Sequence, residues 1–116
     1  MRAGPWSTEE LLRTLCAYAS LNPEDRARPP KELLVSLREL MPKRTLGSIA
    51  MRFSNYVARD PEVRHLNVAG LFGGGSHVDQ LWRINSHDDG ALDRGKLLLS
   101  AVQILGSKMS EPDSSL

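Results

Sequence analysis

A stripe of four polar residues recurs at helical spacing in the middle of the chain and has the residue types that bind DNA. The four residues are Ser48, Arg52, Asn55 and Arg59. A helix over about 45–59 would carry them on one face, at i, i+4, i+7 and i+11, with no acidic residue among them. Arginine can bond guanine through two parallel hydrogen bonds, and asparagine can do the same with adenine. The stripe predicts a helix that reads the major groove, which requires Arg52 and Asn55 to be accessible.

Residues next to this stripe have the types that hold phosphates. Lys43, Arg44 and Thr45, together with Ser48, occupy the turn and the first helical turn, where backbone N–H groups and short side chains meet phosphates. The alternative for the whole set is an ordinary solvated helix face.

The glycine run that ends at Ser76 predicts a second phosphate contact. Its backbone N–H groups and the start of the following helix could contact a DNA phosphate, with Ser76 and His77 assisting. A nucleotide-binding loop would need a Lys followed by Ser or Thr, and the run lacks that pair. A plain flexible loop is the alternative.

Other chemically active residues predict no further site. His65, His77 and His87 do not have the spacing of a metal-binding helix, and no base can be placed beside Cys16. Trp6 and Trp82 could stack on a flipped base, but their positions favour packing in the core. We therefore expect no metal, no cofactor and no catalytic residue.

Apolar spacing predicts six short helices. They cover about 7–20, 30–41, 45–59, 61–67, 76–85 and 91–105. Ser7 and Glu10 form a capping-box pattern at the start of the first helix, and Gly106 is the expected C-cap of the last. Residues 21–28 are expected to be a loop, because they have no apolar periodicity.

These elements predict an all-α fold of five to six short helices around a tri-helical helix-turn-helix core. The core comprises the first three helices, and the glycines between 70 and 76 form a loop or a small wing. We expect one domain over 1–106 and a flexible tail over 107–116.

The composition is that of an ordinary soluble domain with a local basic excess. The chain has 116 residues, of which 41% are hydrophobic and 25% charged, and no apolar run approaches the ~20 residues of a membrane span. Because there is no signal-peptide pattern and a single cysteine, we expect a cytoplasmic protein without a disulfide or a membrane partner. Residues 26–59 hold eight basic and two acidic residues, a net charge of +6, which favours a polyanionic partner.

The chain resembles known DNA-binding domains in its residues as well as in its pattern. Trp6-Ser7, Glu9-Glu10, Tyr18 and RTLGSIAMRFSNY faintly resemble the Myb/SANT arrangement. Over about residues 4–84 the chain more closely resembles the N-terminal domain that precedes HNH nucleases in bacterial modification-dependent (Mcr-type) restriction endonucleases. The positions that carry this resemblance are Pro5-Trp6, Glu9-Glu10-Leu11, Tyr18, Pro30, Glu32-Leu33, Arg44-Thr45, Ser48-Ile49-Ala50-Met51-Arg52-Phe53, Asn55-Tyr56, Asp60-Pro61, Gly70-Leu71 and Trp82.

The resemblance implies a module that binds DNA, or senses modified DNA, in a bacterial restriction or defence system. Its roles carry over to Arg44, Ser48, Arg52 and Asn55. The HNH ββα-metal motif is absent from these 116 residues, so we expect a non-enzymatic protein whose partners are double-stranded DNA and an HNH nuclease domain or a second copy. The alternatives are a SANT-like protein-interaction module and a free-standing transcriptional regulator that dimerises through its C-terminal helix.

Overall fold

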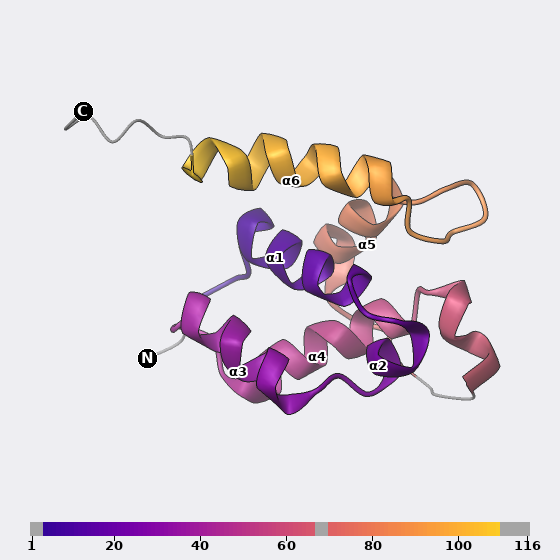
Figure 1. The fold of residues 1–116 in the computed structure, drawn as a ribbon, viewed down its shortest axis with the longest axis horizontal. Helices are drawn as coiled ribbons and strands as arrows, with labels where there is room; N and C mark the ends of the chain where they lie inside the picture. Colours follow the sequence, from indigo (N-terminus) through magenta and orange to yellow (C-terminus); the bar gives the residue numbers. More distant parts are fainter. Residues whose placement is uncertain (1–3, 67–69, 110–116) are drawn as a thin grey trace.

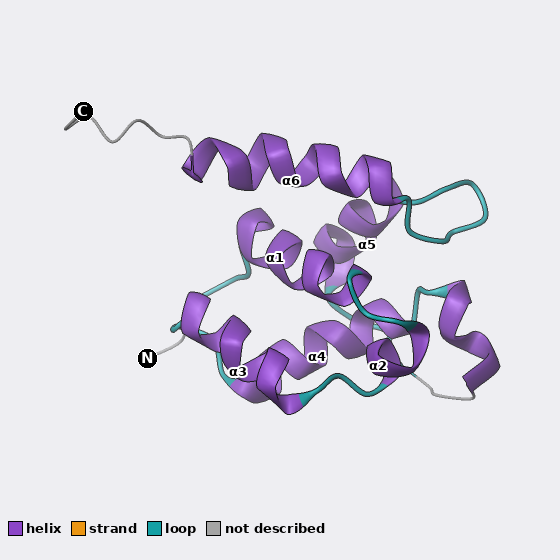
Figure 2. Ribbon diagram, in the orientation of Figure 1, coloured by secondary structure: helices purple, strands orange, loops and turns teal. Residues whose placement is uncertain are grey.

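The computed structural model describes the backbone of residues 4–66 and 70–109, and the side chains as far as Gly106. Its elements are α1 (Thr8–Ala19), α2 (Pro23–Ala27), α3 (Lys31–Leu40), α4 (Leu46–Val57), the 3₁₀ helix η1 (Pro61–Leu66), α5 (Gly75–Ile84) and α6 (Arg94–Met109). Within these residues there is no strand, only an isolated bridge between Ser86 and Leu92 (Figure 2). The expected all-α fold is confirmed.

The helices form layers around α1 (Figure 1). α3 and α4 lie on one side of α1, and α6 lies on the other, alongside α1. The core between α1, α4 and α5 centres on the buried ring of Tyr18, which makes edge contacts with Phe53, Tyr56 and Trp82 at centroid distances of 5.5 to 6.1 Å. The outward face of α6 exposes Leu98, Leu99 and Val102.

Reciprocal caps start the two helices that matter most for the site. Ser7 Oγ accepts a hydrogen bond from the Glu10 N–H, and Glu10 Oε1 accepts one from the Ser7 N–H, so the predicted capping box is confirmed. At α4, Thr45 and Ser48 form the same reciprocal arrangement. Each cap satisfies backbone donors that the helix itself leaves unpaired.

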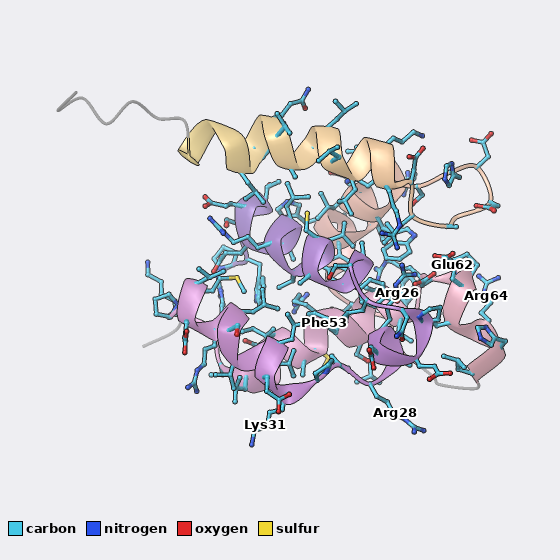
Figure 3. The ribbon with its side chains drawn as sticks, viewed as in Figure 1. Arg26, Arg28, Lys31, Phe53, Glu62 and Arg64 are labelled. Carbon is cyan, nitrogen blue, oxygen red and sulfur yellow. The ribbon has the colours of Figure 1, made fainter. Side chains whose placement is uncertain are left out.

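The predicted loop over 21–28 is wrong, because α2 lies within it. Asn22 caps this helix by accepting from the Asp25 N–H. The helix has no apolar stripe, and a buried cation holds it in place instead. Arg26 donates to the carboxylates of Asp60 and Glu62. Figure 3 shows Arg26 directed toward Glu62 while Arg28 points away from the protein.

The C-terminal helix also differs from the prediction. It begins at Arg94 rather than at 91, because Asp93 Oδ1 accepts the N–H groups of Gly95 and Lys96 and so caps the helix there. It continues to Met109, so Gly106 is not its C-cap and the tail does not start at 107. The rest of the predicted tail, 110–116, lies outside the described residues. In the described part of the chain, no helix combines the length and the apolar character needed to cross a bilayer.

Candidate nucleic-acid interface

The polar stripe of α4 is covered at Asn55, whereas Ser48 and Arg52 are half-buried. Asn55 is 2% exposed, and its Nδ2 donates to the carbonyl oxygen of Leu71 at 2.6 Å. Its Oδ1 is buried and has no hydrogen-bond partner among the described residues. The prediction that Asn55 reads a base edge is therefore wrong, because the segment that begins at Gly70 covers this face of the helix.

Close backbone contact fixes that segment on α4. A Cβ on Gly70 would overlap the backbone nitrogen of Ala58 and the carbonyl oxygen of Ser54, so only glycine allows this approach. The next N–H, that of Leu71, donates to Ser54 Oγ at 2.9 Å. The start of the glycine-rich loop is thus attached to α4 and is not a free wing.

Arg59 is also held inside the protein. Its Nε and Nη2 donate to Asp79 Oδ1 of α5 at 2.8 and 2.6 Å, and its Nη1 donates to the Asn55 carbonyl. The side chain is only 6% exposed. The predicted DNA contact at Arg59 is wrong, because the guanidinium is already bound to a carboxylate from a neighbouring helix.

Arg44 joins the N-terminal segment to the turn before α4. Its Nε and Nη2 bind the two carboxylate oxygens of Glu10 at 2.8 and 2.7 Å, and its remaining donors reach the carbonyls of Gly4 and Pro5. Hydrogen bonding to Arg44 lowers the pKa of the Glu10 carboxyl from 4.5 to about 2, and the same bond raises the pKa of Arg44. The predicted phosphate contact at Arg44 is wrong, because the buried guanidinium has its hydrogen bonds inside the protein.

Arg52 differs from these arginines because it has no carboxylate partner among the described residues. Its guanidinium lies 5.2 Å from the centre of the Trp6 ring, and its Nε is buried without a hydrogen-bond partner there. Desolvation lowers the pKa of Arg52, and the nearby charges of Arg44 and Arg59 act in the same direction. The side chain is therefore a half-buried cation without compensation.

A cleft of 290 Å³ brings Arg52 together with the start of α5. Its lining residues are Pro5, Trp6, Leu11, Arg52, Gly74, His77 and Val78. Gly74, the N-cap of α5, has φ +87°, and a Cβ there would lie 3.0 Å from Arg52 Nη1. No acidic residue occupies the first turn of α5. The positive end of this helix and the Arg52 guanidinium thus meet at one place.

The remaining predicted residues surround this cleft or the start of α4. His77 Nε2 lies 2.8 Å from Thr8 Oγ1, and Ser76 is exposed in the same turn of α5. Ser48, one turn before Arg52 on α4, is half-buried and shares the cap with the exposed Thr45. Lys43 is exposed in the turn before α4.

Two aromatic residues have roles that the sequence did not reveal. Trp6 supports both guanidinium groups, with Arg44 at 4.9 Å and Arg52 at 5.2 Å from its ring. Phe72 is exposed on the glycine-rich loop and lies 4.3 Å from the Arg59 guanidinium. Trp82, by contrast, is buried as expected and donates its Nε1–H to the Gly90 carbonyl.

The Arg52 guanidinium and the N-terminus of α5 give the cleft a positive electrostatic character. Across the described residues, no three His, Cys, Asp or Glu side chains come together as a metal site. Comparisons with protein-family models, with curated proteins and with solved structures found no match to this chain.

Proposed function

We propose that this protein binds double-stranded DNA through its sugar–phosphate backbone, with one phosphate held in the cleft between Arg52 and the start of α5. The observation that carries the proposal is the guanidinium of Arg52, which has no carboxylate partner among the described residues. A phosphate oxygen in the cleft would accept hydrogen bonds from the guanidinium donors of Arg52 that line it. Base reading by Asn55 has no part in the proposal.

Electrostatics around the cleft favour an anion. Glu10 balances the charge of Arg44 and Asp79 balances that of Arg59, so the charge of Arg52 remains uncompensated. Partial removal of Arg52 from water strengthens its attraction for a bound anion. The first turns of α4 and α5 contain no acidic side chain, so both helix N-termini can face a phosphate backbone.

The exposed start of α4 extends this surface. Thr45 and Gly47 are exposed and small, and Lys43 lies exposed in the preceding turn. Small side chains allow a helix to approach DNA closely, and the lysine adds a phosphate contact. We propose that α4 contacts the DNA through this N-terminal end and through Arg52, and not through Asn55 or Arg59.

The biological setting that we propose comes from the resemblance over about residues 4–84. A module of this type in a modification-dependent restriction system would bind DNA without cutting it, and an HNH nuclease domain would supply the cleavage. The alternative, a SANT-like module that holds a peptide, would use the same cation for an acidic side chain.

A titration with a fluorescent 30-base-pair duplex tests the proposal. Arg52→Gln should weaken binding about tenfold and reduce the slope of log K against log salt by about one. The matched control is Arg28→Gln, which removes the same charge from an exposed arginine at the end of α2, near the other end of α1. Equal binding by the two variants would contradict the proposal, and wild-type binding to an acidic peptide but not to DNA would support the alternative.

A further inference from the structure

Two adjacent residues of the glycine-rich loop have large, exposed apolar side chains. Leu71 is 59% exposed and Phe72 is 74% exposed, the highest value among the large apolar side chains that the structure describes. Adjacent exposed apolar side chains are a feature of surfaces that contact a partner. We call Leu71 and Phe72 the apolar tip.

The backbone of the apolar tip is held on both sides. The Leu71 N–H donates to Ser54 Oγ, and the Leu71 carbonyl accepts from Asn55 Nδ2, so both polar groups of one residue are bound to α4. The residue before it, Gly70, packs directly on the backbone of Ala58. Asn55 is therefore part of the support that holds the tip in an exposed position.

The ring of Phe72 rests on a fixed cation. Its centroid lies 4.3 Å from the Arg59 guanidinium carbon. That guanidinium is held in turn by Asp79 and by the Asn55 carbonyl. One side of the ring is thus supported within the protein, and most of the side chain remains free to contact a partner.

The apolar tip lies next to the proposed phosphate site. Phe72 is two residues from Gly74, so their Cα atoms are at most about 7 Å apart. Successive nucleotides of one strand advance about 3.4 Å along the duplex. A duplex whose phosphate is held at Arg52 would therefore pass close to the tip.

We propose that the apolar tip inserts at a base step of the bound duplex and partly unstacks it. Phenylalanine and leucine are side chains that DNA-bending proteins use as wedges between bases. The inference rests on the proposed function, and the adjoining Arg52 cation makes DNA the favoured occupant over an apolar groove of another protein. The rigid support from α4 allows the tip to keep its shape while bases separate.

Two duplexes of equal length and charge test this inference, one fully paired and one with a central mismatch. A mismatch lowers the cost of separating bases, so wild type should bind the mismatched duplex roughly tenfold more tightly. Phe72→Ala should remove that preference, and Phe72→Trp should retain it. Arg52→Gln should weaken binding to both duplexes by the same factor and leave the preference intact.

Leu98→Ala is the matched control, because it shortens an exposed apolar side chain on α6 and should change neither affinity. Thermal melting of each variant checks that the exposed substitutions leave the fold intact. Equal wild-type affinity for the two duplexes would contradict insertion of the tip at a base step. A preference for the mismatched duplex that persists in Phe72→Ala would contradict it as well. Either result would favour a protein partner for the tip. Failure of wild type to bind either duplex would instead overturn the proposed function.

Discussion

Arg44 and Arg52 share the Trp6 ring but have opposite surroundings. Both guanidinium groups lie about 5 Å from its centroid, at 4.9 and 5.2 Å. Arg44 binds both oxygens of Glu10 and two backbone carbonyls, whereas Arg52 has no carboxylate partner in the part of the chain that the structure describes. The first arginine connects elements of the fold, and the second retains its capacity to bind an external anion.

This difference separates a structural cation from a binding cation. Arg26 and Arg59 follow the pattern of Arg44, since each is buried against a carboxylate from another element. Burial of a charge without a partner costs free energy, so an uncompensated cation in a cleft marks a place where the protein gives up stability. Arg52 is such a cation, and the proposed function therefore depends on it.

Arg44→Ala should lower the free energy of unfolding more than any other substitution in this comparison. Removal of this guanidinium leaves the Glu10 carboxylate beside the unpaired carbonyls of Gly4 and Pro5. We expect the free energy of unfolding to fall by about 3 kcal/mol, as measured by urea denaturation. Arg38→Ala, at an exposed position of α3, is the control, and it should stay within about 0.5 kcal/mol of wild type. If Arg44→Ala loses as little stability as the control, the Arg44–Glu10 ion pair does not stabilise the fold.

Glu10→Gln should have the next largest effect and should change how stability depends on pH. Because the carboxyl pKa falls from 4.5 to about 2 on folding, Glu10 stabilises the native state above about pH 4.5. That contribution is lost as the pH falls from about 4.5 to 2. Glutamine can still cap α1 but carries no charge, so the free energy of unfolding of the variant should be about 2 kcal/mol lower at pH 7. Below about pH 4.5, the stability of the variant should depend less on pH than that of wild type.

Urea denaturation at several pH values between 2 and 7 measures both quantities. Glu9→Gln serves as the control, because Glu9 occupies the same first turn of α1 and forms an ion pair with Arg13. If Glu10→Gln loses stability in acid as steeply as wild type does, another carboxyl group is responsible for the acid dependence.

Most of the helices could be predicted from the sequence because their signals are local. The capping box of Ser7 and Glu10 and the apolar stripe from Leu46 to Val57 place α1 and α4 within a few residues of their observed bounds. α2 could not be found in this way, because its buried anchor is Arg26, a residue that polarity assigns to the surface. The carboxylates that hold Arg26 lie in Asp60 and Glu62, more than 30 residues along the chain.

The site was harder to predict for the same reason. Residue types and helical spacing correctly group Arg52 and Asn55 on one face of α4, with Arg59 just beyond its end, but spacing does not say what covers that face. The partners are the Leu71 carbonyl and Asp79, which lie 16 and 20 residues away. Of this group, Arg52 is half-buried, so it meets the required accessibility only in part, but it has no carboxylate partner among the described residues.

Of the three substitutions at Arg44, Glu10 and Arg52, Arg52→Gln should change stability least. The substitution removes a desolvated charge and part of the contact with Trp6, two effects of opposite sign, so the free energy of unfolding should stay within about 1 kcal/mol of wild type. Urea denaturation beside Arg44→Ala measures the contrast directly. A loss near 3 kcal/mol at Arg52 would mean that its donors are satisfied within the fold, and the phosphate site would lose its physical basis. Stability near that of wild type, combined with weaker DNA binding, would separate the two arginines by role although they share one aromatic ring.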